Sequence, residues 1–314
     1  MNRFRPILRA LPVLAALLPA PAVANDKLTL LLDWFVNSNH EAILTAEANG
    51  DFARHGLDVT LIAPADPSSP PRLLAAHQAD LCVSYQPSLG SLVEGGLPVR
   101  RVGTLLDTPL NEMLVLADGP IRSLKDLKGR HIGMEVGAAN EAALGVMLAE
   151  AGLKRSDVQV TEIGMQIETA LMSHSVDAVL GAMRNYEQID LQQRGVKVRA
   201  FLPEEHGEPL YDELILLARA DEVSDPRIPR FLDALADATN TLLNHPEEMW
   251  AKAIAKRPDL DTPLNHAAWM ATLPRLAKTP ALLDRKRYES FQRFMKAQGQ
   301  QDAVLRVEKI TAEE

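Results

Sequence analysis

Hydrophobic residues come in short runs along the first two thirds of the chain. Runs rich in leucine or β-branched residues alternate with longer stretches of helical pattern. Short apolar runs are typical of buried strands, so this alternation predicts a mostly parallel sheet with helices on both faces. Ten strands are expected, at residues 27–33, 57–63, 80–85, 99–106, 112–118, 130–135, 158–164, 176–182, 196–202 and 213–220.

The pattern changes after Asp221. From Ile228 to Val307 the sequence predicts helices alone, separated by breaks that contain proline. Large aromatic residues inside such helices usually pack into a core. Four are expected to anchor this helical C-terminal region: Trp250, Trp269, Phe291 and Phe294.

Two of the expected strands resemble each other although they lie about 100 residues apart. EMLVLAD at 112–118 and ELILLARAD at 213–221 are both apolar and both end in aspartate. They bracket a segment with its own α/β pattern, as in a chain that crosses to a second lobe and returns. The alternative is that both are ordinary strands of one sheet. The crossing interpretation predicts lobe 1 at 25–113 plus 216–314, and lobe 2 at 114–215.

The first 24 residues have the features of a secretory signal peptide. Arg3, Arg5 and Arg9 precede an apolar stretch, and Ala22 and Ala24 are the small residues that a signal peptidase reads. We therefore expect cleavage after Ala24, with a signal anchor as the alternative. The apolar stretch is too short to span a bilayer comfortably, and no lipobox cysteine follows it. A periplasmic, monomeric protein without direct membrane insertion is expected.

Charge narrows the classes of partner. The formal net charge is −9, and removal of three arginines and no acids with the leader brings it to −12. Nucleic acid and anionic lipid are poor partners for such a chain. The single cysteine, Cys82, excludes an intramolecular disulfide and is expected to fill the core. The histidines show no metal-ligand spacing and no GxSxG motif occurs, so neither a metal, a cofactor nor a catalytic triad is expected.

The polar connection WFVNSNH follows the first expected strand. Trp34 offers a flat apolar face, while Asn37, Asn39 and His40 supply hydrogen-bonding groups where the next helix begins. Open α/β sheets bind ligands at the carboxyl ends of their strands, so we expect these side chains to face a crevice. The alternative is that Asn39 caps the helix and the other side chains are core or solvated. SYQPSL at 84–89 follows another strand and is expected to place Ser84 and Tyr85 at the same crevice, together with Gln86 and Ser88.

Two connections of the second lobe are candidates for the facing wall. Asn185, Tyr186 and Glu187 follow the strand at 176–182. A tyrosine beside a carboxylate suits a flat amino-substituted heterocycle, because the ring stacks and the carboxylate accepts from the amine. The alternative is the start of a surface helix, where Asn185 caps the helix and the helix dipole favours the negative charge of Glu187. Gly137, in a glycine turn before a helix, is a candidate for backbone contacts to an anionic group, although this pattern by itself is weak.

Several of these segments together resemble a known family. LLDWFVNSNHEAILTAEANGDFARHGLDVTLIAPADPSSP, ADLCVSYQPSL, GMEVG and RNYE are similar to periplasmic binding proteins for the pyrimidine precursors of thiamine. That family also contains the yeast-type pyrimidine synthase of thiamine biosynthesis. The likeness runs from about Leu28 to about Gln193. It implies an α/β, two-lobed type II periplasmic binding protein fold that closes on a ligand and delivers it to an ABC permease.

The enzyme branch of this family holds pyridoxal phosphate on a lysine and uses a histidine four residues later. In the matching segment of this chain those places fall on Ser84 and Ser88, and the cysteine-rich motif of that branch has no counterpart at 204–216. The resemblance therefore favours the binding-protein branch. We expect Trp34 and Tyr186 to stack on the ring of a small aminopyrimidine or similar flat heterocycle, and Glu187 to bond its amine edge. Asn37, Asn39 and Ser84 are expected to fix the orientation of the ring.

The alternatives concern the cargo and the role. A binding protein of the same fold for a flavin, a sulfonate or another amine heterocycle is compatible with the same residues, and so is a sensory or scaffolding module. A pyrimidine synthase is the enzyme alternative, and the missing lysine, histidine and cysteines count against it.

Overall fold

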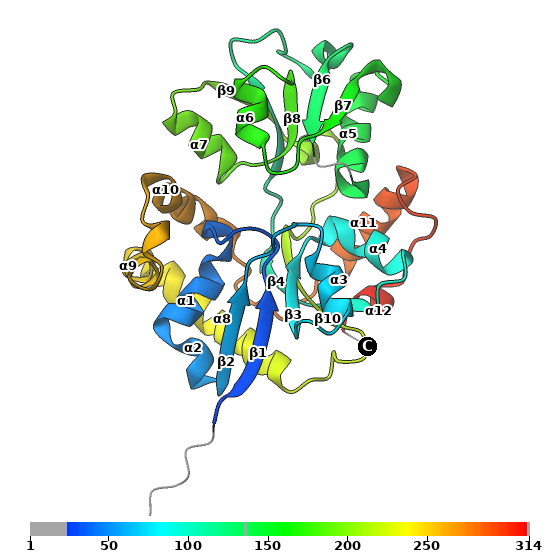
Figure 1. Ribbon diagram of the computed structural model, residues 1–314. Coiled ribbons are helices and arrows are strands. Elements are labelled where there is room, and N and C mark those ends of the chain that lie inside the picture. The colour runs from blue at the N-terminus through cyan, green and yellow to red at the C-terminus, as the bar shows by residue number, and fades with distance from the viewer. Residues whose placement is uncertain (1–23, 135–136, 313–314) are drawn as a thin grey trace, which may run out of the picture.

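The computed structural model describes residues 24–134 and 137–312. It contains two five-stranded sheets, each covered by helices on both faces (Figure 1). Apart from Ala24, the predicted signal peptide lies outside the described residues. Each of the ten predicted strands is present, with both ends within two residues of the expected bounds. No helix in the described part of the chain is long and apolar enough to cross a membrane.

The first sheet has the strand order β2-β1-β3-β10-β4. Strand β1 pairs in parallel with β2 and β3, whereas β10 is antiparallel to both β3 and β4. Its strands are β1 (Asp26–Leu31), β2 (Leu57–Ile62), β3 (Leu81–Ser84), β4 (Val99–Leu106) and β10 (Leu214–Arg219).

The second sheet has the order β7-β6-β8-β5-β9. Strand β6 pairs in parallel with β7 and β8, and β5 is antiparallel to β8 and β9. Its strands are β5 (Asn111–Leu116), β6 (His131–Met134), β7 (Gln159–Glu162), β8 (Ala178–Met183) and β9 (Val198–Phe201).

The two sheets share one topology when β6 to β9 are matched with β1 to β4. In each, the fourth position belongs to the strand that arrives from the other sheet, which is β10 in the first and β5 in the second. These are the two look-alike runs of the sequence. In each sheet four strands run in the same direction, and only the incoming strand runs against its neighbours. The prediction of mostly parallel strands is therefore confirmed, with one antiparallel strand in each sheet that the sequence did not predict.

The chain passes between the sheets through residues 107–110 and 202–213. Strand β5 already begins at Asn111, so residues 111–113, which the sequence division left in lobe 1, pair in the second sheet. Strand β10 begins at Leu214 and belongs to the first sheet. We propose that these two connections, rather than residues inside the strands, divide the chain into lobes.

Helices cover both faces of each sheet and form four separate apolar cores. Helices α1, α2, α8 and α9 lie on one face of the first sheet, and α3, α4, α11 and α12 on the other (Figure 1). In the second sheet α5 lies on one face and α6 and α7 on the other. The helices before β10 are α1 (Glu41–Asn49), α2 (Asp51–Arg54), α3 (Pro70–Ala75), α4 (Gln86–Glu94), α5 (Ala138–Glu150), α6 (Ile167–Met172) and α7 (Glu187–Gln193).

After β10 the chain is helical, as predicted. The helices are α8 (Arg227–Asn244), α9 (Pro246–Lys256), α10 (Pro263–Thr272), α11 (Arg285–Ala297) and α12 (Val307–Ile310). All four predicted aromatic anchors are buried. Trp250 and Trp269 pack edge to face at 5.4 Å in the core around α1 and α8, while Phe291 and Phe294 pack between α11 and α5. Cys82 is fully buried in the core on the other face of the first sheet, as expected.

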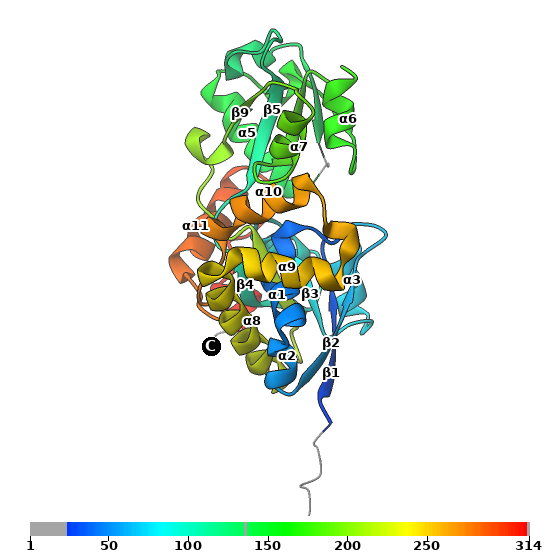
Figure 2. The same cartoon turned by 90° about the vertical axis from the view of Figure 1, so that its left-hand side faces the viewer.

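The helical region also touches the second lobe. Helix α10 packs against α7 (Figure 2), and α11 and α4 pack against α5 on the other side of the molecule. The two lobes are therefore joined on both flanks, and the space between these flanks is bounded by the carboxyl ends of β1 and β8.

Candidate functional site

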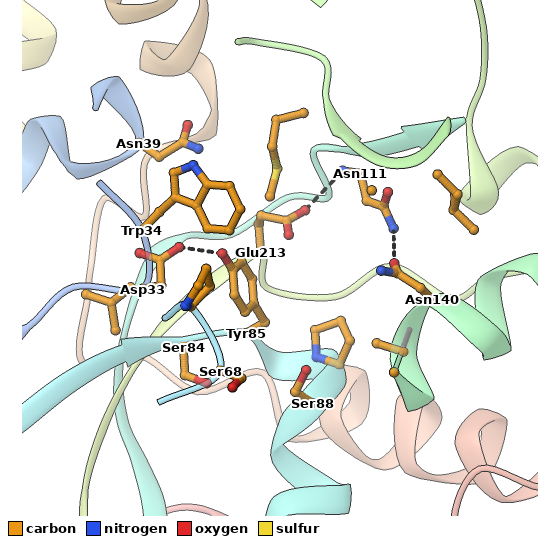
Figure 3. Close-up of a pocket in the computed structure, with 18 of the residues that line it drawn as sticks. Asp33, Trp34, Asn39, Ser68, Ser84, Tyr85, Ser88, Asn111, Asn140 and Glu213 are labelled. Atoms are coloured by element: carbon orange, nitrogen blue, oxygen red, sulfur yellow. Dashed lines mark hydrogen bonds between the residues drawn. The ribbon is translucent and has the colours of Figure 1, made fainter. Parts of the chain in front are cut away.

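A cavity of about 290 Å³ lies between the two sheets. One wall comes from the connection after β1 and from the start of α4, and the facing wall from the starts of α5 and α7. Figure 3 shows Trp34 and Ser88 of the first wall and Asn140 of the facing one. The second crossing connection, residues 202–213, supplies a further part of the wall. The cavity thus lies where open α/β sheets hold ligands, beyond the carboxyl ends of strands.

The turn after β1 is fixed by its own polar side chains. Asn37 caps the short 3₁₀ helix Ser38–His40, and its Oδ1 accepts from the Asn39 backbone N–H at 2.8 Å. Its Nδ2 donates to the carbonyl of Phe35 at 3.1 Å. These bonds hold the backbone so that Trp34, Asn37 and Asn39 all line the cavity, where the sequence predicts them.

Asp33 is the carboxylate of this wall. Its Oδ1 lies 2.8 Å from His40 Nε2, and its Oδ2 accepts from the Tyr85 hydroxyl at 2.5 Å (Figure 3). Burial acts to raise the pKa of Asp33, but the hydrogen bonds with His40 and Tyr85 outweigh it, so the pKa is lowered. Asp33 therefore stays ionised inside the cavity.

The connection after β3 supplies the rest of this wall. Ser84, Tyr85 and Ser88 line the cavity, as predicted. Gln86 does not: it is buried beside the hinge, where its Oε1 accepts from the Asp212 backbone N–H at 2.7 Å.

The facing wall carries Tyr186 and Glu187, as predicted. Oε2 of Glu187 accepts from the Met183 backbone N–H at 2.8 Å, which fixes the carboxyl group at the start of α7. Burial raises the pKa of Glu187 to about 8, because the Met183 bond offsets only part of the lost hydration. The Tyr186 ring packs edge to face on Phe35 of the opposite lobe at 6.0 Å.

Gly137 also lines the cavity, at the start of α5. Its φ of −168° is extended backbone that any residue adopts, and among the described residues, chain neighbours aside, a Cβ there would meet no atom within 4 Å. Neither the turn nor its packing requires glycine at this position, so the open space beside it is what makes it a candidate for contact with a ligand.

Two predicted ligand residues lie behind the cavity wall, which corrects their placement. His40 is buried, and besides its contact with Asp33 its Nδ1 accepts from the Asn37 N–H at 3.3 Å. Asn185 is buried between the lobes, where its Nδ2 donates to Asn39 Oδ1 at 2.5 Å and to Thr272 Oγ1 at 2.7 Å. His40 thus orients Asp33, and Asn185 joins the lobes.

Sequence reasoning missed several lining residues. Asp33 ends the first expected strand, and this position alone could have identified it as a lining residue. Glu208, Tyr211 and Glu213 come from the second crossing connection, and Asn111 follows the first. Connections between lobes border the cleft in a two-lobed protein, so a search of both crossings for polar residues would have found them.

The lining is strongly acidic. It contains four carboxylic side chains, from Asp33, Glu187, Glu208 and Glu213, against one basic side chain, the exposed Arg72. The described lining residues include no lysine, histidine or cysteine. Within the described residues no group of three or more histidine, cysteine or acidic side chains is arranged to hold a metal ion. The lining can therefore offer a ligand aromatic faces and carboxyl groups.

The chain as a whole is similar to proteins of a known family. The family model described as "NMT1/THI5 like" matches residues 37–249. A Haemophilus influenzae protein named for thiamine biosynthesis is 43% identical over 288 residues, which cover 91% of this chain and 92% of that protein. The formylaminopyrimidine-binding protein of Halalkalibacterium halodurans is 30% identical over 77% of this chain and 74% of its own. The 4-amino-5-hydroxymethyl-2-methylpyrimidine phosphate synthase of Legionella pneumophila is 25% identical, over 83% of each chain.

Solved structures share the fold at low identity. The alkanesulfonate-binding protein from Xanthomonas axonopodis superposes with a TM-score of 0.72 at 17% identity, over 91% of this chain and 98% of that one. A Candida albicans protein described as having the generic periplasmic binding protein fold gives a TM-score of 0.66 at 15% identity, over 90% and 92%. The two-lobed periplasmic binding protein fold expected from the sequence is thus confirmed.

Proposed function

The chain belongs to the NMT1/THI5-like family, and on that basis we propose that it binds an aminopyrimidine precursor of thiamine between its lobes. In this proposal it is the exported solute-binding component of an ABC importer and delivers its cargo to the permease. The observation that carries the proposal is the cavity itself, in which Trp34 on one wall and Tyr186 with Glu187 on the other combine stacking faces with a carboxyl group.

The size and lining of the cavity support a small ring. Ligand cavities commonly measure roughly 300 to 1,000 Å³, so 290 Å³ lies at the small end of that range. Two aromatic side chains from opposite lobes give a flat ring two faces to contact, and each such contact contributes about 0.5–1.5 kcal/mol beyond the burial of area. A ring held from both lobes also couples binding to closure.

The charges support an amine-bearing ring. Glu187 has its pKa raised to about 8 by burial, so its carboxyl group is largely protonated at neutral pH. A neutral carboxyl group both donates and accepts, which matches the ring nitrogen and adjacent exocyclic amine of an aminopyrimidine. The fixed negative charge of Asp33 on the opposite wall disfavours a sulfonate.

The family also contains synthases, and two residues of the cavity bear on that alternative. Ser84 and Ser88 both line the cavity at the places where the resemblance puts the lysine and the histidine of the enzyme branch. A hydroxyl group forms no Schiff base with a pyridoxal aldehyde. With no lysine among the described lining residues, the proposal is a binding protein rather than an enzyme.

Calorimetric titration tests the cargo directly. We expect the wild-type protein to bind 4-amino-5-hydroxymethyl-2-methylpyrimidine or its formylaminomethyl counterpart with micromolar or better affinity, and riboflavin at least a hundredfold more weakly. Trp34→Ala should weaken pyrimidine binding by about tenfold without changing the melting temperature of the free protein, because Trp34 lines the cavity rather than the core. Affinity for riboflavin alone would overturn the cargo and leave the fold intact.

We also propose that the protein is exported, because its first 24 residues have the features of a signal peptide. N-terminal sequencing of the mature protein should begin at Asn25. A start at Met1, or a lipid on the first residue, would contradict a free periplasmic protein.

A further inference from the structure

An aromatic side chain outside the cavity contacts both of its candidate stacking residues. The centroid of the Phe35 ring lies 5.9 Å from that of Trp34 and 6.0 Å from that of Tyr186. Trp34 belongs to the turn after β1 in the first lobe, and Tyr186 to the start of α7 in the second. Phe35 itself is not among the described residues that line the cavity. It therefore connects the two stacking walls without being part of either.

Phe35 is a large apolar side chain that stays 44% exposed to solvent. Single exposed apolar side chains are common on protein surfaces and need no functional explanation. Phe35 differs from Ile62, which is 42% exposed in the same lobe, because its ring packs against a ring of the other lobe. Parting of the lobes would break this contact and expose the Phe35 ring further to water. The contact therefore favours the arrangement in which the lobes are closed.

Hydrogen bonds fix the backbone on both sides of this ring contact. In the first lobe the Phe35 carbonyl accepts from Asn37 Nδ2 at 3.1 Å. In the second lobe Asn185, the residue before Tyr186, donates to Asn39 Oδ1 across the cleft at 2.5 Å. The ring contact and the amide contact thus join the same two turns. Each ring is held by its own lobe, so the distance between the rings depends on how far the lobes close.

This arrangement bears on how a ligand leaves. In the proposed complex a flat ring lies between Trp34 and Tyr186, and its release requires these two walls to separate. Separation of the walls also breaks the contact between Phe35 and Tyr186. One aromatic pair contributes enough to change an equilibrium by about two- to tenfold. Because the contact must break before the ligand leaves, its effect belongs to the dissociation rate.

We propose that Phe35 is a positioning residue that holds the Trp34 and Tyr186 walls together across the cleft and so slows the release of the ligand. It acts through these two side chains and does not touch the ligand. The proposal rests on the function proposed above, because it requires that the two rings enclose the cargo. It adds a residue outside the cavity to those that set affinity, and it holds for any flat cargo bound between the rings.

Stopped-flow fluorescence measures the two rate constants of binding. Trp34 is the reporter, because Trp250 and Trp269 are buried in the core of the first lobe. Mixing the protein with increasing concentrations of 4-amino-5-hydroxymethyl-2-methylpyrimidine gives the association and dissociation rate constants. Phe35→Ala should raise the dissociation rate constant about three- to tenfold and leave the association rate constant within about twofold. Phe35→Tyr keeps a ring at this position and should release the ligand at the wild-type rate.

Ile62→Ala is the matched control, since Ile62 is about as exposed as Phe35, lies in the same lobe and is not among the described lining residues. It should change neither rate constant. In a Tyr186→Ala background the partner ring is gone, so Phe35→Ala should raise the dissociation rate constant by less than about twofold. Full additivity of the two substitutions, or a Phe35→Ala dissociation rate equal to that of the wild type, overturns the role of Phe35 while the proposed function stands.

Hydrogen exchange tests the same contact without a ligand. Phe35→Ala should speed exchange about three- to tenfold in peptides from residues 185–193, although the substitution lies in the other lobe, and Ile62→Ala should leave these peptides unchanged. Unchanged protection in Phe35→Ala would show that Phe35 does not hold α7. Faster exchange throughout the first lobe as well would show a general loss of stability, and either result overturns the role of Phe35. If the wild-type protein binds no pyrimidine, the proposed function fails, and hydrogen exchange still decides whether Phe35 joins the lobes.

Discussion

Buried carboxyl groups of this protein behave differently according to their neighbours. Asp33 keeps its charge because His40 and Tyr85 both bind it. Glu112, at the start of β5, is also buried, but its Oε1 has no hydrogen-bond partner among the described residues. Burial raises the pKa of Glu112 to about 8, and the Arg184 charge lowers it only in part. Two buried carboxyl groups therefore differ: Asp33 is an anion, whereas Glu112 is a protonated acid at neutral pH.

Glu112→Gln should change how stability depends on pH. The folded protein holds the Glu112 proton up to about pH 8, whereas the unfolded chain releases it near 4.5. The free energy of unfolding of the wild-type protein therefore falls as pH rises from about 4.5 to 8. The glutamine has no proton to release, so between pH 5 and pH 8 the free energy of unfolding of the variant should fall by roughly 3 kcal/mol less than that of the wild type.

Urea unfolding at pH 5, 6.5 and 8 measures this difference. Glu205→Gln is the control, because an exposed glutamate should leave the profile parallel to that of the wild type. A Glu112→Gln profile that is also parallel to the wild type would show that Glu112 is ionised in the folded protein.

At the scale of elements, the connection between β8 and α7 serves two purposes. Tyr186 and Glu187 face the cavity, while Asn185, the residue just before them, turns toward the first lobe. Its amide reaches Asn39 in the middle of the short helix Ser38–His40 and Thr272 at the end of α10. The C-terminal helices therefore do more than cover the first sheet, since α10 holds the second lobe against it.

Thr272→Val should loosen this contact. The substitution keeps the shape but removes the oxygen that accepts from Asn185, so one buried hydrogen bond between the lobes is lost. Such a bond is worth about 0.5–1.5 kcal/mol, so ligand affinity should fall by about two- to tenfold if closure and binding are coupled. Calorimetric titration against the same pyrimidine measures the change.

Thr311→Val is a closely matched control. Thr311 is buried, and its hydroxyl donates to the Val307 carbonyl at 3.0 Å, as the Thr272 hydroxyl does to the Ala268 carbonyl at 2.7 Å. It lies in the first lobe, far along the chain from α7. Equal affinity losses in both variants would mean that Thr272 matters for the fold and not for closure.

At the scale of the whole molecule, the cavity exists because two sheets of one topology face each other across two connections. Each lobe has its own cores, and few side chains join them apart from those of α10 with α7 and of α4 and α11 with α5. Such an interface between lobes permits relative motion about the connections.

Small-angle scattering should detect this motion. We expect the radius of gyration to decrease when saturating pyrimidine is added, since a ligand that contacts both walls favours the closed arrangement. The scattering mass should correspond to a monomer. Riboflavin at the same concentration is the control and should leave the radius unchanged. Equal dimensions with and without pyrimidine would contradict a closing clamp.

The sequence by itself determined the local elements and much of the site. Apolar runs marked all ten strands, since a buried strand needs a short continuous apolar stretch wherever it lies. The aromatic anchors of the tail and the lining residues Trp34, Ser84, Tyr85, Tyr186 and Glu187 were also found, because ligand contacts in α/β sheets follow strand ends. The likeness of the two runs at 112–118 and 213–221 indicated where the chain passes between the two sheets.

Only the tertiary structure decided the direction of strands and the partners of polar side chains. Whether β5 and β10 pair parallel or antiparallel depends on the lobe from which each arrives, which no local pattern encodes. His40 and Asn185 look like ligand residues in the sequence, yet His40 contacts Asp33 within its own turn and Asn185 bonds to Asn39 and Thr272 across the cleft. Glu208 and Glu213 entered the site because the second crossing folds back against the cavity. Hydrogen-bond partners are chosen by proximity in space, and proximity between lobes exists only once both sheets have formed.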